Sequence, residues 1–226
     1  MKTIFKTLAA LIGFSTVAFS QEAPQIGFIR IVNAISPGSG NASFLIDKKD
    51  LFKDGYNIGQ TSGGYGVKSG SKNVEVRKEG VEPGTTKVEL AVGETMTIIA
   101  FAERLPAKDP NDPPKWAIKL LKLKQQDVAE KGFGLSLVSV CKSDEMPVTL
   151  VLMSSGKQQT AYAKRLAIQK VDIGRLRGEV LVKRAETLLC TVSPDSPGNY
   201  VVILYEDAKG QVEALSYYDP KFVVAG

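Results

Sequence analysis

Short runs in which apolar and polar residues alternate, or in which β-branched residues cluster, follow one another along most of the chain after residue 20. Gly, Pro, Asn and Asp separate these runs, and this rhythm is typical of strands joined by turns. No window before residue 104 has the capped, 3.6-residue apolar stripe of a helix of normal length. The strands predicted in this part are 26–34, 43–47, 64–68, 72–78, 85–92 and 95–103. We therefore expect an all-β protein.

Turns are predicted where turn-forming residues gather. They are SPGSGN at 36–41, KDGYN at 53–57, SGGYG at 62–66 and EPG at 82–84. The proline-rich segment 107–115 cannot continue a sheet ladder. The stretch WAIKLLKLK at 116–124 fits a strand or a short, basic, amphipathic helix, and we favour the strand because QVEALSYYD at 211–219 alternates similarly.

The second part of the chain repeats the order of the first, since Gly27-Phe28 recurs as Gly132-Phe133, 105 residues later. Four segments match in sequence: 27–34 with 132–140, 73–78 with 179–184, 87–92 with 187–192, and 95–103 with 200–208. Because the matches keep their order and the insertions fall in turns, they favour an internal duplication. The alternative is one continuous β-protein whose strands share a common pattern.

The repeat predicts two tandem immunoglobulin-like antiparallel β-sandwich domains, at 21–124 and 132–226, with a linker at 125–131. In each domain two sheets would bury alternate residues between them. The outward faces would then carry the Lys, Arg and Glu side chains.

The first twenty residues have the layout of a secretory signal peptide. Lys2 and Lys6 form a basic head, 8–19 is an apolar run, and Ala18-Phe19-Ser20 is a small-residue cleavage site. A spanning helix needs about 20 apolar residues, and this run is shorter and interrupted. We expect cleavage after Ser20, no transmembrane segment in the mature chain, and a periplasmic, cell-surface or secreted location.

Composition removes several function classes. The chain has no histidine and two cysteines, so imidazole-based triads, histidine zinc sites and thiolate metal cages are excluded. Without the lysines of the signal peptide, 27 basic side chains face 24 acidic ones, a balance too even to indicate nucleic-acid binding. We expect no enzyme activity, no metal and no cofactor.

The two cysteines, Cys141 and Cys190, are candidates for a disulfide because export leads to compartments that can be oxidising. Closing a loop of about 50 residues would stabilise the fold by roughly 4 kcal/mol. The alternative is two buried free thiols that behave as small hydrophobic residues.

Tyrosines gather in the last predicted strands, at Tyr200, Tyr205, Tyr217 and Tyr218. If exposed, they would form a binding surface for a protein or glycan, because each ring combines apolar area with a hydroxyl. The alternative is that they pack within the core and the sheets.

Three acids near strand ends, Glu103, Glu206 and Asp207, are the only hints of catalysis. A carboxylate-dependent glycan hydrolase needs two such groups about 5 to 10 Å apart across a cleft. The alternative is that these acids only keep the surface soluble.

Residues 27–103 resemble the bacterial exported β-sandwich family catalogued as domain-of-unknown-function 4397. Arg30-Ile31-Val32-Asn33-Ala34 fills the family's R-[IV]-[IV]-[NH]-A strand, and Tyr65-Gly66, Val74-Glu75-Val76 and the strand opened by Gly93 follow in order. The second copy departs from this pattern at Ser139-Val140-Cys141. The resemblance implies an exported, immunoglobulin-like module without an assigned reaction.

These observations predict a non-enzymatic envelope or secreted protein that acts as a binding or structural module, with a protein or glycan partner. One alternative is a subunit of a surface appendage that associates by strand addition through the apolar C-terminal segment, 221–226. The other is the carboxylate-dependent glycan hydrolase.

Overall fold

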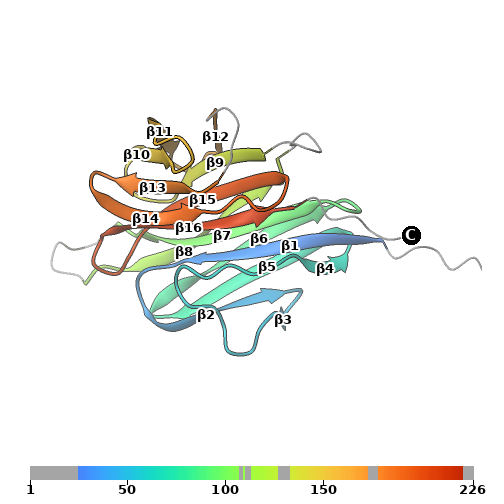
Figure 1. The fold of residues 1–226 in the computed structure, drawn as a ribbon. Coiled ribbons are helices and arrows are strands. Elements are labelled where there is room, and N and C mark those ends of the chain that lie inside the picture. Colours follow the sequence, from blue (N-terminus) through green and yellow to red (C-terminus); the bar gives the residue numbers. More distant parts are fainter. Residues whose placement is uncertain (1–24, 107–108, 110–112, 127–132, 173–177, 221–226) are drawn as a thin grey trace, which may run out of the picture.

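A computed structural model describes residues 25–106, 109, 113–126, 133–172 and 178–220, and every regular element within these ranges is a β-strand. The N-terminal half contains β1 (Ile26–Ala34), β2 (Ser39–Ile46), β3 (Lys49–Asp50), β4 (Tyr65–Lys68), β5 (Gly70–Glu79), β6 (Val81–Leu90), β7 (Thr95–Arg104) and β8 (Trp116–Lys124). The C-terminal half contains β9 (Phe133–Ser139), β10 (Glu145–Leu152), β11 (Gln158–Lys164), β12 (Gln169–Val171), β13 (Val180–Arg184), β14 (Thr187–Val192), β15 (Gly198–Glu206) and β16 (Val212–Asp219). The predicted all-β class is confirmed (Figure 1).

Most predicted strands coincide with observed ones, and 116–124 is a strand rather than a helix. The turn predicted at 82–84 is wrong, because these residues lie inside β6. The hairpin turns instead at Gly80, whose φ of 78° lies in the region that favours glycine. Pro83 has no N–H to donate, and it is tolerated because the ladder with β5 is irregular between Val76 and Lys78.

The two halves have corresponding strand orders. The N-terminal sheet runs β3-β2-β5-β6-β8-β7-β1-β4, and the C-terminal half has two sheets, β11-β10-β13-β14 and β12-β9-β15-β16. In each half the first strand pairs in parallel with the last but one, β1 with β7 and β9 with β15. Among the described residues, no strand ladder joins one half to the other.

A close approach of β6 to β8 makes the N-terminal sheet continuous. The two strands share a single paired position, Glu82 with Ala117. Next to it, a Cβ added at Gly84 would lie 2.6 Å from the carbonyl oxygen of Ile118, so only glycine fits. In the C-terminal half the corresponding strands, β14 and β16, form no ladder, and the Ser216 hydroxyl donates to the carbonyl of Thr191 at 3.2 Å.

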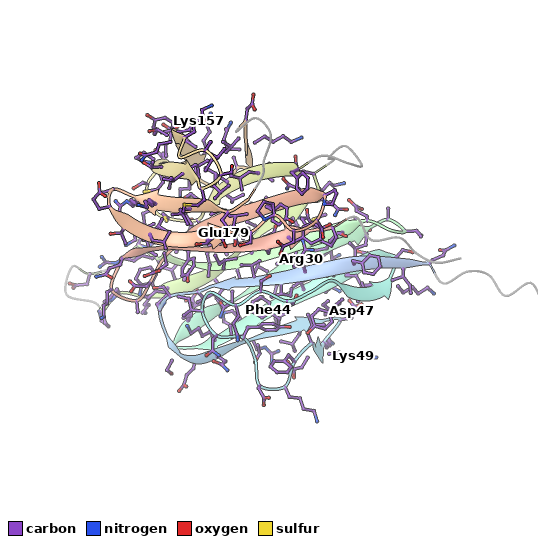
Figure 2. All side chains as sticks on the ribbon, in the orientation of Figure 1. Arg30, Phe44, Asp47, Lys49, Lys157 and Glu179 are labelled. Carbon is purple, nitrogen blue, oxygen red and sulfur yellow. The ribbon has the colours of Figure 1, made fainter. Side chains whose placement is uncertain are left out.

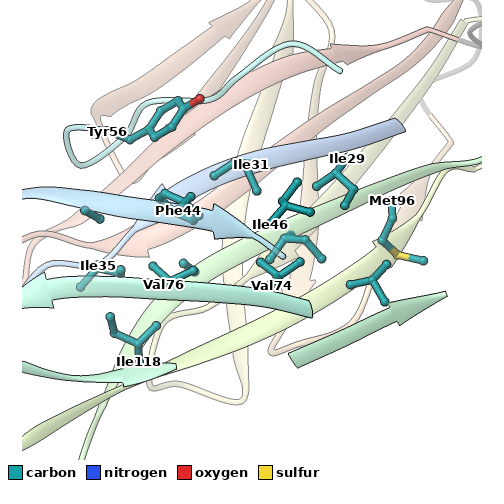
Figure 3. Packing of buried hydrophobic residues seen from close by; sticks show 14 of the residues in the cluster. Ile29, Ile31, Ile35, Phe44, Ile46, Tyr56, Val74, Val76, Met96 and Ile118 are labelled. Atoms are coloured by element: carbon teal, nitrogen blue, oxygen red, sulfur yellow. The ribbon is translucent and has the colours of Figure 1, made fainter. Parts of the chain in front are cut away.

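Each half has its own apolar core between facing strands. In the N-terminal core, β1 and β7 face β2, β5 and β6 (Figure 3), and its largest fully buried side chains are Phe44, Ile29, Ile31, Ile35 and Ile98. In the C-terminal core, β9 and β15 face β10, β11, β13 and β14 through residues that include Leu135, Leu137, Leu150 and Leu204.

A third apolar layer, the central core, lies between the two halves. It joins Val32, Ala34, Ile99, Phe101 and Leu123 of the N-terminal half to Val138, Val140, Val201, Ile203, Tyr205, Leu215 and Tyr217 of the C-terminal half. The molecule is therefore a stack of sheet layers, with the blue and green strands facing the yellow and red ones (Figure 1).

The strands next to the central core bury both of their faces. On β1, Ile31 enters the N-terminal core and Val32 the central core. On β15, Val202 enters the C-terminal core and Ile203 the central core. The expectation that the outward faces carry charged residues is therefore wrong for these strands, since the other half covers that face. Charged outward faces do occur on strands such as β6, where Val88 is buried and its neighbours Lys87 and Glu89 are exposed.

A buried ion pair connects the halves at one end of the central core. Arg30 on β1 donates to the carboxylate of Asp219 on β16 at 2.5 Å, and the two side chains are only 3% and 4% exposed. The guanidinium also lies 4.6 Å from the centre of the Tyr217 ring and 3.4 Å from the Thr97 hydroxyl. Figure 2 shows Arg30 on the side of β1 that faces the red strands.

We expect that breaking this pair on one side destabilises the fold strongly. Arg30→Met leaves the buried Asp219 carboxylate without its cation, which should lower the free energy of unfolding by about 3 to 5 kcal/mol. Adding Asp219→Leu should recover much of the loss, because the remaining charge is also removed. Urea unfolding of the single and double variants measures both effects.

The control is Lys124→Met, which removes the exposed ion pair between Lys124 and Glu94 at 3.1 Å. This variant should change stability much less, because solvent screens such pairs. Equal losses in Arg30→Met and Lys124→Met would contradict the structural importance of the buried pair.

Candidate functional site

The central core opens at its other end into a cleft of about 750 Å³ between the two halves. The N-terminal half contributes the ends of β1 and β7 and the start of β8, and the C-terminal half contributes the ends of β9 and β15 with the turns that follow them. The side chains that define its character are Phe101, Glu103, Trp116, Val140, Lys142, Arg165, Glu206 and Asp207. We call this space the inter-half cleft.

The floor of the cleft is apolar, because it continues the central core. Ala34, Phe101 and Val140 belong to both. Trp116, the first residue of β8, is half-buried and packs against the N-terminal core, which fixes its ring at the cleft wall.

Glu103 and Arg165 form an ion pair across the cleft, one from each half. Their side chains are 34% and 26% exposed. Arg165 is held from several sides: its Nε donates to the carbonyl of Cys141 at 3.0 Å, and its backbone N–H donates to the carbonyl of Asp144 at 2.8 Å. The guanidinium therefore reaches Glu103 from a fixed position.

Leu166, next to Arg165, has a positive φ of 56°, which is rare for a bulky side chain. Its N–H donates to the carbonyl of Ser139 at 2.8 Å, and its side chain packs against the central core. These contacts hold the left-handed backbone of Leu166 in place directly after Arg165, which lines the cleft.

Lys142 and Glu206 form a second, looser pair on the C-terminal side. The ammonium lies 3.9 Å from the carboxylate, and the backbone N–H of Lys142 points to the same group at 3.5 Å. The ammonium is also 5.6 Å from the centre of the Trp116 ring. Glu206 is 23% exposed, whereas Lys142 is 71% exposed.

The predicted acids thus line one cleft, two of them in ion pairs and the third in a turn. Glu103 pairs with Arg165, and Glu206 pairs with Lys142. Asp207 accepts from the backbone N–H groups of Lys209 and Gln211, both at 2.8 Å, and so shapes the β15–β16 turn.

The predicted tyrosine surface is not formed. Tyr200, Tyr205 and Tyr217 are 5%, 9% and 8% exposed, whereas Tyr218 is 36% exposed. Tyr200 lies in the C-terminal core and exchanges hydrogen bonds with the backbone of Ser196. These three rings pack inside the protein, as the alternative interpretation held.

Tyr205 and Tyr217 face the central core. Burial raises the pKa of Tyr217 to about 12 and also raises the pKa of Tyr205 above its usual value. The Tyr205 hydroxyl lies against Gly59 of the other half, where an added Cβ would come within 2.6 Å of it. Gly59 also has a φ of 77°, a backbone conformation that favours glycine.

Both cysteines are free thiols, so the predicted disulfide is not formed. Cys141 is buried in the C-terminal core, and Cys190 packs against the same core from β14. Burial raises the pKa of the Cys141 thiol, and raises that of Cys190 to about 12. The alternative of a buried free thiol that acts as a small hydrophobic residue holds for Cys141, whereas Cys190 is only half-buried.

We expect both thiols to react slowly with alkylating agents in the folded protein, because Cys141 is buried, Cys190 is half-buried, and the raised pKa of each disfavours the reactive thiolate. Iodoacetamide added without reductant should label both cysteines after denaturation and neither one rapidly before it, as measured by mass spectrometry. Two cysteines that stay unlabelled in denaturant until a reductant is added would show a disulfide instead.

Sequence reasoning missed Trp116, Lys142 and Arg165 as members of a site. Trp116 carried one signal, since it is the only tryptophan of the chain and directly follows the proline-rich segment. Lys142 and Arg165 carried none, because only the packing of the halves brings them to the cleft. Within the described ranges, no group of three or more Cys, Asp or Glu side chains could hold a metal ion.

No protein-family model matches this chain, and no curated protein matches it. The resemblance to domain-of-unknown-function 4397 therefore stays a prediction. In the part of the chain that the structure describes, no helix has the length and hydropathy needed to cross a membrane. The predicted signal peptide and the C-terminal segment 221–226 lie outside the described residues.

Proposed function

We propose that this chain is a non-enzymatic, exported protein of the cell envelope or extracellular space, and that it binds a partner in the inter-half cleft. Export is supported by the basic head, apolar run and small-residue site of its first twenty residues. The absence of histidine from the sequence supports binding over catalysis.

Two tandem immunoglobulin-like β-sandwich domains, derived by duplication, are part of this proposal. Corresponding strand orders and a separate apolar core in each half support it. The backbone N–H of Ile35 donates to the side chain of Asn33 at 3.0 Å, and that of Cys141 donates to Ser139 at 3.2 Å. These bonds lie 106 residues apart, close to the repeat offset.

The observation that carries the binding role is the cleft itself, where a half-buried tryptophan and charged side chains lie over an apolar floor. Its volume of about 750 Å³ lies within the range of ligand sites. Tryptophan is enriched among the residues that dominate binding energy, because its ring offers a large apolar face with a polar edge. A glycan or a protein side chain fits this arrangement.

We expect Trp116→Ala to weaken partner binding by about tenfold or more, as is typical for the loss of a central aromatic contact. A glycan array measures binding to glycans, and cross-linking on intact cells that export the protein measures binding to protein partners. The matched control is Tyr162→Ala, which removes an aromatic ring that is 51% exposed on β11, away from the cleft. Equal binding by Trp116→Ala and the unmodified protein would contradict the proposed site.

A carboxylate-dependent glycan hydrolase is the second candidate, because Glu103 and Glu206 line the same cleft. The ion pairs to Arg165 and Lys142 weigh against it, since both carboxylates are already engaged. We expect glycans bound by the protein to remain uncleaved during prolonged incubation, measured by release of reducing ends. Turnover that disappears in Glu103→Gln or Glu206→Gln would establish the hydrolase instead.

A further inference from the structure

In the free protein, a cation already occupies the space between an aromatic ring and a carboxylate in the inter-half cleft. The Lys142 ammonium lies 5.6 Å from the centre of the Trp116 ring and 3.9 Å from the Glu206 carboxylate. An ammonium over a tryptophan face with a carboxylate nearby is the usual geometry of cation recognition.

The ring and the carboxylate are better fixed than the lysine. Trp116 packs against the N-terminal core at the start of β8, and Glu206 is 23% exposed at the end of β15. Lys142 is 71% exposed, and its distance from Glu206 exceeds that of a direct hydrogen bond. The ammonium can therefore leave the ring while the two groups that hold it stay in place.

We propose that Trp116 and Glu206 form a cation-binding subsite, which Lys142 fills in the free protein and which a Lys or Arg side chain of a protein partner takes over. This inference rests on the proposed binding function of the cleft. It names the chemistry of the ligand, a primary ammonium or guanidinium on an apolar stem.

Charge and shape both favour such a ligand. When Lys142 moves away, Glu206 loses its counter-charge, and an incoming cation restores it, whereas a neutral sugar does not. Arg104, Arg165 and Lys209 also line the cleft, so this preference for a cation belongs to the position beside Glu206 and not to the cleft as a whole. The apolar floor formed by Phe101 and Val140 suits the methylene stem of a lysine or arginine, which packs along apolar surface while its head stays polar.

Trp116 fluorescence tests the subsite directly, because no other tryptophan contributes to the signal. The probe is Nα-acetyl-lysinamide, and its neutral counterpart is Nα-acetyl-norleucinamide, both titrated at constant ionic strength. The unmodified protein should bind the lysine probe and not the norleucine one. Lys142→Gln removes the internal competitor, so it should bind the lysine probe about two- to fivefold more tightly, in proportion to an exposed cation–π contact.

Adding Glu206→Gln to Lys142→Gln should reverse this gain, because the carboxylate is the second half of the subsite. The matched control is Lys157→Gln, the same charge change in the turn between β10 and β11 (Figure 2), which should leave the affinity unchanged. Equal thermal unfolding temperatures of the variants show that the fold is intact.

Unchanged or weaker binding of the lysine probe in Lys142→Gln would overturn the subsite. Equal binding of the two probes would overturn it as well, since the cleft would then recognise only apolar stems. A glycan that binds in a Trp116-dependent manner while both probes fail would overturn the cation subsite and leave the proposed binding function intact. Loss of all Trp116-dependent binding would overturn both.

Discussion

The fold depends on the central core, where β1 and β7 of one half pack against β9 and β15 of the other. These strands bury both faces, so separating the halves would expose a continuous apolar surface that includes Ile99, Phe101, Val201 and Ile203. Such a surface is costly in water and prone to association. Each half has a core of its own, but the hydrophobic effect makes the pair the stable unit.

Two ion pairs at opposite ends of this layer determine how the halves are aligned. Arg30 of the N-terminal half meets Asp219 of the C-terminal half in a buried site, and Glu103 meets Arg165 at the cleft. An apolar layer alone tolerates sliding, whereas a buried charge without its partner is strongly unfavourable. The Arg30 pair therefore selects one alignment, and that alignment brings Trp116 to face Lys142 and Glu206.

Corresponding positions in the two halves have diverged in chemistry while keeping their structural place. Cys141 in the C-terminal core corresponds to Ile35 in the N-terminal core. The backbone N–H of each residue donates to a polar side chain two residues earlier. Ser136 and Asn199 form a buried hydrogen bond at 3.2 Å in the C-terminal half. Ser136 is the residue of this half that corresponds to the charged Arg30. The halves thus differ most in chemistry at positions that keep the same place in the fold.

The sequence by itself determined the strands, because local alternation and turn residues are enough to place elements such as 26–34 and 116–124. The continuous apolar runs at 98–101 and 201–204 also indicate strands that are buried on both faces. The expectation that only alternate residues are buried does not account for these runs. Only the tertiary structure decided which faces met, that Cys141 and Cys190 stay unbridged, and that Glu103 and Glu206 share a cleft with Trp116. The physical reason is separation along the chain: the contact between Arg30 and Asp219 joins residues 189 positions apart, and no local pattern encodes such a pairing.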